Sequence, residues 1–366
     1  MRVRNFRRFS FWATSTPEKS HLVLNSVADR FADYTVVLIT TFTDENEKEI
    51  RNRFIQECNC IPSNIVIKTW FSFLLQHGVR PYQGYLFEKE ITGLILCNGQ
   101  SVPGSRETNV ERHYISENKK IYSDKIAKFA CRCDEQSNGA VISRLSKIYT
   151  HIFIDEVQDL AGYDLEFLNK LFLAPLEILL VGDPRQGTYS TNNSAKNKQY
   201  KRSSILEYFI LNKQKFNLEI DSDSLNINHR CVHEICDFSN KLYPEMVATT
   251  SGNTTEIEHK GIYFVRPIDV EEYLHLYNPI QLRPSKSTDT HSSYACLNFG
   301  NSKGLSFDRV LIYPTKPILK WILNGDELAP TSKSKLYVAI TRARYSVAII
   351  FDYRTDTHVD GVYKYK

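Results

Sequence analysis

The sequence predicts an α/β fold in which parallel strands alternate with helices. Each predicted strand ends at a turn signal and leads into a helical pattern, as βαβ units do. None of the strands shows polar alternation, which is typical of strands buried on both faces of a parallel sheet. The runs rich in β-branched and aromatic residues that carry this prediction are 35–40, 151–154, 178–181, 309–313 and 346–351.

Composition and charge indicate an ordinary globular protein of about two domains in 366 residues. Hydrophobic residues at 42% and charged residues at 24% exclude a disordered, collagen-like or coiled-coil chain. The 46 Lys and Arg against 42 Asp and Glu leave a net charge of +4, which identifies neither a nucleic-acid nor a membrane partner. The eight cysteines include no C-x-x-C pair, so we expect reduced thiols and no structural zinc. Without an apolar run for secretion or membrane insertion, we expect a cytoplasmic protein with no membrane partner.

Two polar stretches predict how the chain is divided. Residues 74–147 are mixed in composition and contain loop signals, so we interpret them as an insertion in the first sheet domain. Residues 212–223 form a second polar stretch, which we interpret as the join between domains. We therefore expect a first lobe over 1–222, with its insertion at about 74–147, and a second lobe over 223–366.

Adjacent carboxylates follow the predicted strand 151–154. At the carboxyl end of a strand, Asp155 can hold a magnesium ion while Glu156 positions or deprotonates water. An acidic surface loop is the alternative. The next strand ends in a tight turn that presents Gln186, a side chain able to report the state of a γ-phosphate. Arg230 and Arg342 stand at later element boundaries, and their planar guanidinium groups suit phosphoryl transfer.

In this order, these segments resemble the UvrD/Rep-like superfamily 1 DNA helicases. The match extends through residues 40–43, 68–73 and 298–307 and covers nearly the whole chain. The resemblance implies two RecA-like lobes with ATP bound in the cleft between them. It also implies Mg²⁺ as a second cofactor and single-stranded DNA as the partner. The site residues it implies are the catalytic Glu156, Asp155, Gln186, Arg230 and Arg342; the nucleotide ligands Lys19, Ser20, His229 and Gly304; and the magnesium ligands Ser20 and Asp155.

The same resemblance implies a set of strand-contacting residues. They are Phe42, Thr43, Trp70 and Tyr189. Each aromatic side chain has an alternative interpretation as part of the hydrophobic core. The basic residues Lys196, Lys198, Lys201 and Arg202 follow the Gln186 turn, and they either contact phosphates or form a solvated surface. Thr191 replaces a second stacking aromatic of the family, and His229 replaces an adenine-stacking tyrosine.

The phosphate loop departs from the family pattern. Residues 13–20 read Ala-Thr-Ser-Thr-Pro-Glu-Lys-Ser, so Lys19 and Ser20 are kept while the glycines are lost. Glycines in such loops accept positive φ and let backbone N–H groups close around phosphate. Glu18 would repel phosphate by about 4 kcal/mol at a separation of about 4 Å. Either the loop is genuinely altered, or the residues before Lys19 are not native because of a frameshift or a misplaced start.

The short second lobe makes this a minimal form of the family. With the segments 79–83, 182–186 and 302–305, that form looks like the short helicase-like proteins encoded beside nuclease-ATPase partners in Gabija-type phage-defence systems. Our leading hypothesis is a magnesium-dependent DNA helicase, a DNA-dependent ATPase that moves 3′ to 5′ on single-stranded DNA despite a degenerate phosphate loop. The main alternative is a non-hydrolysing regulatory or DNA-binding subunit of a nuclease-containing phage-defence complex. A degraded gene product that keeps the fold without activity is a third hypothesis.

Overall fold

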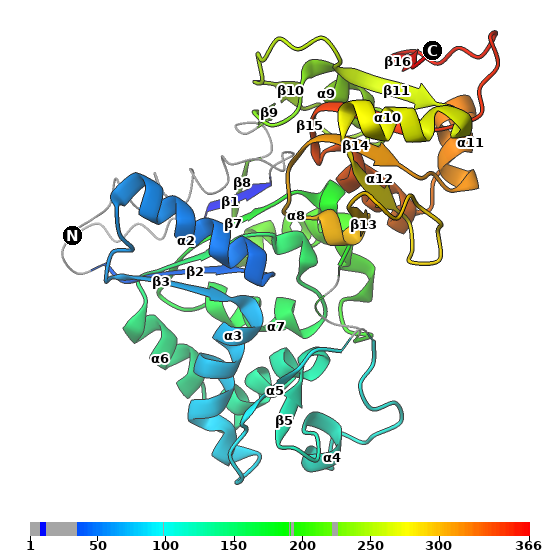
Figure 1. Ribbon diagram of the computed structural model, residues 1–366. Helices are drawn as coiled ribbons and strands as arrows, with labels where there is room; N and C mark the ends of the chain where they lie inside the picture. Colours follow the sequence, from blue (N-terminus) through cyan, green and yellow to red (C-terminus); the bar gives the residue numbers. More distant parts are fainter. Residues whose placement is uncertain (1–7, 12–34, 98, 190, 192–193, 222–225) are drawn as a thin grey trace. The chain divides into compact units, whose positions relative to one another are not determined.

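The computed structural model describes residues 8–11, 35–97, 99–189, 191, 194–221 and 226–366, and for 8–11 it describes the backbone alone. The chain forms two compact units. The first unit ends at Asp221, and the second contains the residues after it together with Arg185–Thr188. Within the described residues, each unit is built on a sheet of six strands flanked by helices (Figure 1).

All neighbouring strands of the first sheet run parallel. The strands expected at 35–40, 151–154 and 178–181 are confirmed as three of its members. In the order in which they lie side by side, the strands are β3 (Ile65–Thr69), β2 (Val37–Thr41), β6 (His151–Ile154), β7 (Glu177–Gly182), β1 (Arg8–Phe11) and β8 (Glu219–Asp221).

The first sheet is covered on both faces, as its unbroken apolar runs predict. Along β2, Ile39 packs with Ile50 and Phe54 of α2, whereas Leu38 faces the larger core formed with α5 and α7. Figure 1 shows α2 over one side of the sheet and α7 on the other. The principal helices of this unit are α2 (Asp44–Cys58), α3 (Trp70–Phe73), α5 (Ser123–Gln136), α6 (Ala140–Ile148), α7 (Tyr163–Phe172) and α8 (Ile205–Phe216).

The segment expected to be an insertion at about 74–147 packs into the main core of the first unit. Phe129 and Ile126 of α5 belong to the same hydrophobic cluster as Ile152 of β6 and Leu168 of α7. This segment therefore supplies a helical layer of the unit as well as loops. Besides α5 and α6, its elements are the π-helical turn η1 (Leu74–Val79), the 3-10 helix η2 (Arg80–Tyr85), α4 (Val110–Tyr114) and the paired strands β4 (Gly93–Ile95) and β5 (Lys120–Tyr122).

The second unit repeats the parallel architecture, and it contains the strands expected at 309–313 and 346–351. In spatial order its strands are β13 (Cys296–Asn298), β12 (Ile280–Arg283), β14 (Phe307–Ile312), β15 (Ala343–Ile350), β11 (Gly261–Val265) and β16 (Val362–Lys364). The helices are α9 (His233–Asn240), α10 (Val270–Tyr277), α11 (Lys316–Asn324) and α12 (Pro330–Ile340), and a separate pair of strands is formed by β9 (Ile227–Asn228) and β10 (Thr250–Ser251).

The helices of the second unit also cover both faces of its sheet. Phe264 of β11 packs in the cluster that holds Leu336 of α12, whereas the next residue, Val265, packs against Tyr273 of α10. The eight cysteines are free thiols. In the part of the chain that the structure describes, no helix combines the length and the apolar character needed to cross a bilayer.

Candidate functional site

A turn with two carboxylates follows β6 at the carboxyl end of the first sheet. The Asp155 N–H donates to the Thr40 carbonyl at 2.8 Å, and Asp155 Oδ1 accepts the Glu156 N–H at 2.8 Å. Glu156 adopts the left-handed conformation with φ 55° and is only 8% exposed. A non-glycine residue in this conformation is uncommon, and such residues concentrate at functional sites. The turn therefore holds Glu156 in one defined orientation.

Gln158 fixes that orientation from inside the protein. It lies fully buried in the 3-10 turn η3 (Val157–Asp159), and its Nε2 donates to the Glu156 carboxylate. Its Oε1 accepts the Asp183 N–H at 3.1 Å. A Cβ atom at Gly182 would lie 2.5 Å from Gln158 Oε1, so only glycine permits this approach. The sequence alone does not point to Gln158 or Gly182 as site residues, because nothing in the local pattern tells a buried amide from an exposed one.

The end of the first sheet is suited to hold magnesium through few protein ligands. Mg²⁺ in nucleotide sites usually takes one or two carboxylates and completes its shell with water and phosphate oxygens. Asp155 fits that role, and the described residues contain no cluster of three or more ligating side chains that would make a closed site. The hydroxyls of Thr40 and Thr41 are buried beside it and hydrogen-bond to no described residue. The expected ligands Lys19 and Ser20, with the rest of the phosphate loop at 13–20, lie outside the described residues.

Three of the expected phosphate-contacting residues converge at the end of α12. Arg342 is 1% exposed, and its Nη2 donates to Gln186 Oε1 at 3.4 Å. Its Nη1 donates to the Leu305 carbonyl at 3.2 Å. Arg230 Nη1 reaches the carbonyl of Thr341 at 3.3 Å. The second unit thus brings Gln186, Arg230 and Arg342 together, although they are far apart in sequence.

Two further expected nucleotide ligands lie in loops of the second unit. Gly304 has a φ of 84°, which glycine adopts without strain, and it precedes the Leu305 carbonyl that accepts from Arg342. His229 is exposed and follows β9. Its ring packs closely over Gly252, where a Cβ atom would lie 2.6 Å from His229 Nδ1. Gly252 therefore sets the position of the His229 ring.

A cluster of three aromatic rings, the aromatic cluster, lies in the first unit near the carboxyl ends of β2 and β3. The rings of Phe42 and Phe71 are 5.7 Å apart edge to face, and those of Phe42 and Tyr189 are 6.0 Å apart. All three side chains are partly exposed. Phe42 and Tyr189 were expected from the sequence, whereas Phe71 was missed. Partly exposed rings that are held together offer stacking faces for nucleic-acid bases.

The structure corrects the expectation for Trp70. Its indole is 1% exposed and donates to Asp164 Oδ1 at 2.7 Å, so it has no free face for a base. Thr69 caps α3 by accepting the Ser72 N–H at 3.3 Å, and within this short helix Trp70 is buried whereas Phe71 is partly exposed. Thr43, also expected to contact the strand, caps α2 by accepting the Asn46 N–H at 3.2 Å.

Asp164 joins the segment of Trp70 to the segment that follows Tyr189. Its Oδ1 accepts from Trp70, and its Oδ2 accepts the Thr191 hydroxyl. The Thr191 N–H in turn donates to the Asp159 carbonyl of η3 at 2.9 Å. Burial raises the pKa of Asp164 to about 6, although the hydrogen bonds from Thr191 and Trp70 oppose this shift. Thr191 thus has a structural role at the position where the resembling family carries a stacking aromatic.

Comparisons with known proteins connect this geometry to helicases. A family model described as "Viral superfamily 1 RNA helicase core domain" matches residues 114–351. A putative ATP-dependent DNA helicase of Acanthamoeba polyphaga mimivirus is 30% identical over 151 residues, which are 41% of this chain and 19% of that protein. The matched part of the chain thus spans about a fifth of the length of this relative.

Solved helicase structures are similar to the chain at low sequence identity. The arterivirus nonstructural protein 10 helicase is 12% identical with a TM-score of 0.49, covering 95% of this chain and 60% of that one. A structure of the arterivirus protein with DNA has a TM-score of 0.48 at 13% identity, covering 95% and 61%. The PRRSV helicase has a TM-score of 0.46 at 14% identity, covering 97% and 55%.

Proposed function

The chain belongs to the family of viral superfamily 1 RNA helicase core domains, and on this premise we propose that it is a nucleic-acid-dependent ATPase that moves along a single strand. The observation that carries the proposal is the orientation of Glu156. Its carboxylate is nearly buried, its backbone is left-handed, and Gln158 connects it to the end of the neighbouring strand β7. Such a carboxylate is suited to accept a proton from a water molecule.

The other site residues complement this role. Gln186, Arg230 and Arg342 supply an amide and two fixed positive charges, which suit the charge that develops on a transferring phosphoryl group. Asp155 would hold magnesium together with Ser20, and magnesium when bound neutralises charge on the nucleotide phosphates. His229 would stack on the base of ATP, and Lys19 and Gly304 would contact its phosphates.

The aromatic cluster of Phe42, Phe71 and Tyr189 is the proposed contact for bases of the strand. Single-stranded DNA as the substrate and 3′ to 5′ movement are the finer predictions, and both rest on the UvrD/Rep-like resemblance. An unwinding assay measures both the substrate and the polarity. It compares partial duplexes that carry a 3′ or a 5′ single-stranded tail and are made of DNA or of RNA. Faster unwinding of the 5′-tailed substrates would contradict the polarity, and faster unwinding of RNA would contradict the substrate.

The experiment that tests the ATPase compares Glu156→Gln with the wild type in the presence of single-stranded DNA. We expect hydrolysis to fall by at least about 100-fold, because the base is lost while the shape is kept. Glu49→Gln is the matched control, since Glu49 lies exposed on α2 and forms an ion pair with Arg53, one turn along the same helix, at 2.7 Å. Equal turnover by the wild type and Glu156→Gln would contradict the role of Glu156.

A second candidate function is favoured by the loss of glycines from residues 13–20. In this proposal the chain binds DNA as a non-hydrolysing subunit beside a nuclease, as the Gabija-type resemblance implies. Wild-type protein that binds single-stranded DNA but neither binds nor hydrolyses ATP would support it. If the loop alone is limiting, replacing Thr14, Thr16 and Glu18 together by glycine will strengthen ATP binding, because both backbone strain and the repulsion of phosphate by Glu18 are removed.

A further inference from the structure

A group of basic side chains follows the aromatic cluster along the chain and has no role in the site described above. Lys198 begins the 3-10 turn η5 (Lys198–Tyr200), Lys201 follows it, and Arg202 begins η6 (Arg202–Ser204). Within the described part of the chain, neither Lys198 nor Lys201 forms an ion pair. The pKa of Lys201 is lowered, mainly by burial and further by the charges of Arg202 and Lys198. Positive charge is therefore concentrated here, and no acidic group among the described residues is paired with either lysine.

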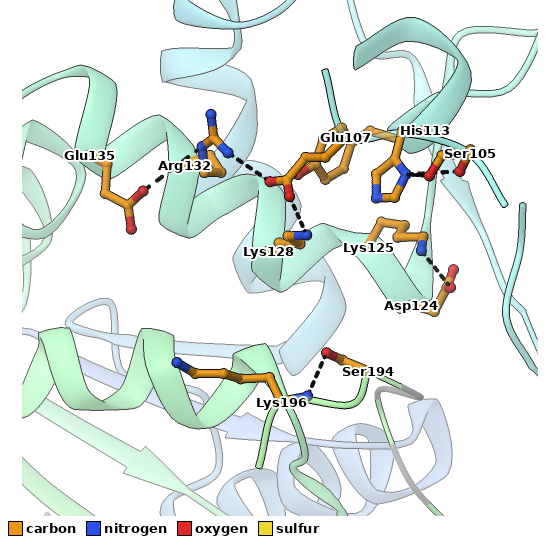
Figure 2. Close-up of polar contacts among 11 residues, drawn as sticks. Ser105, Glu107, His113, Asp124, Lys125, Lys128, Arg132, Glu135, Ser194 and Lys196 are labelled. Carbon is orange, nitrogen blue, oxygen red and sulfur yellow. Dashed lines mark hydrogen bonds and ion pairs between the residues drawn. The ribbon is translucent and has the colours of Figure 1, made fainter. Parts of the chain in front are cut away.

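Some other basic residues of the first unit are paired with neighbouring acids. Glu107 accepts from Lys128 at 2.6 Å and from Arg132 at 2.7 Å, and these contacts form an ion-pair cluster on α5 (Figure 2). Lys196, two residues before Lys198, lies 3.7 Å from the Glu166 carboxylate. The charges of Lys198 and Lys201 thus differ from those of their neighbours, because they are available to an external anion.

The turn that carries the two lysines is held rigidly. Asn197 has a left-handed backbone with φ 54°, and its Nδ2 donates to the Gly162 carbonyl at 3.1 Å and to Glu166 Oε1 at 2.9 Å. Tyr200 packs edge to face against Tyr208 of α8 at 5.1 Å. The backbone of this turn therefore loses little conformational entropy when its lysines bind a ligand.

The chain segments next to Tyr189 and Lys201 contact the same short turn, η3. Thr191, two residues after Tyr189, donates its N–H to the Asp159 carbonyl of η3. The turn η6, which directly follows Lys201, packs against η3 as well. The segment after Tyr189, whose ring belongs to the aromatic cluster, and the turn after Lys201 thus both contact η3. The same turn carries Gln158, the residue that orients Glu156.

We propose that Lys198 and Lys201 contact two backbone phosphates of the single strand whose bases stack on Phe42, Phe71 and Tyr189. This inference rests on the proposed function. Contacts of this kind carry no sequence information, so they would set the affinity for any strand and its dependence on salt.

The test measures the affinity of the full chain for fluorescent oligo-dT and oligo-U without nucleotide, over a range of salt concentrations. Each phosphate contact to a single strand contributes about 0.7 to the slope of log affinity against log salt. We expect Lys198→Gln with Lys201→Gln to reduce this slope by about 1.4, so that its affinity relative to the wild type changes about 25-fold over a tenfold range of salt. Lys213→Gln with Lys215→Gln is the matched control, because these exposed lysines of α8 carry the same charge.

The outcomes separate this inference from the proposed function. If the salt-dependence slope is unchanged in the Lys198 and Lys201 variant, or falls equally in the control, the inference is overturned. Strand binding by the wild type would in that case still support the proposed function. If the variant loses affinity for ATP while its salt-dependence slope for oligonucleotide is unchanged, the lysines face the nucleotide. That result would also overturn the inference. A wild type that binds neither oligonucleotide would instead refute the proposed function, and the inference with it.

Discussion

The buried carboxyl of Asp164 gives the most quantitative prediction. Its pKa is raised by burial from 3.8 to about 6, so the folded protein binds a proton at this site more tightly than the unfolded chain does. The contribution of this group to stability is therefore fully present below pH 3.8 and is lost as the pH rises through 6. The amide in Asp164→Asn has a similar shape but does not titrate, so the variant lacks this loss.

The size of the effect follows from the two pKa values. Between about pH 4 and 7.5, the free energy of unfolding of the wild type should fall by about 2 kcal/mol relative to that of Asp164→Asn. Urea unfolding at both pH values measures this difference. The fluorescence of Trp70 reports on the site directly, because its indole N–H donates to Asp164. The chain has three tryptophans, so the other two, Trp12 and Trp321, are first replaced by phenylalanine.

In that background, the fluorescence of folded protein should titrate near pH 6 with Asp164 present and should not titrate in Asp164→Asn. Asp44→Asn serves as a control, since it removes an exposed carboxylate from the same unit. Parallel pH dependences of unfolding in the wild type and Asp164→Asn, with no titration of Trp70 fluorescence, would refute the argument. Asp164 would then not be the buried acid that joins the Trp70 and Thr191 segments.

Three further predictions follow from close packing and exposure. Gly182→Ala should destabilise the first unit by about 1 to 3 kcal/mol in thermal unfolding, because the added Cβ would lie 2.5 Å from Gln158 Oε1. Gly84→Ala should be nearly neutral, since a Cβ there would have nothing within 4 Å, and equal effects of the two substitutions would contradict the packing argument. Phe71→Ala should weaken single-strand binding by about 1 to 3 kcal/mol in a titration, and normal affinity in the folded variant would exclude Phe71 from the contact. Cys58 and Cys60 are exposed, so these two thiols should react with a thiol reagent before the buried ones do. Mass spectrometry of the labelled protein measures the order, and earlier labelling of a buried cysteine would contradict the prediction.

The local pattern of the sequence determined the sheets. The runs at 152–154 and 178–181 are apolar, and they form neighbouring parallel strands with both faces covered. Strand ends also follow from local signals, so the positions of Asp155 and Glu156 at the end of β6 could be predicted. The roles predicted for Phe42 and Tyr189 came from the resemblance, and those for Arg230 and Arg342 came from guanidinium chemistry together with it. All four stay predictions, although the structure brings these residues into two clusters.

Tertiary structure decided which side chains these positions expose and join. Trp70 and Phe71 are adjacent aromatics with the same local signal. Trp70 turns inward because its indole donates a hydrogen bond to Asp164, which lies 94 positions further along the chain. Gln158 was not distinguishable because its role depends on a backbone N–H of the next strand, which Gly182 allows to approach. Arg342 meets Gln186 across 156 positions. Periodicity reports burial along one element, whereas partners of this kind are set by how separate elements pack, which the local pattern does not encode.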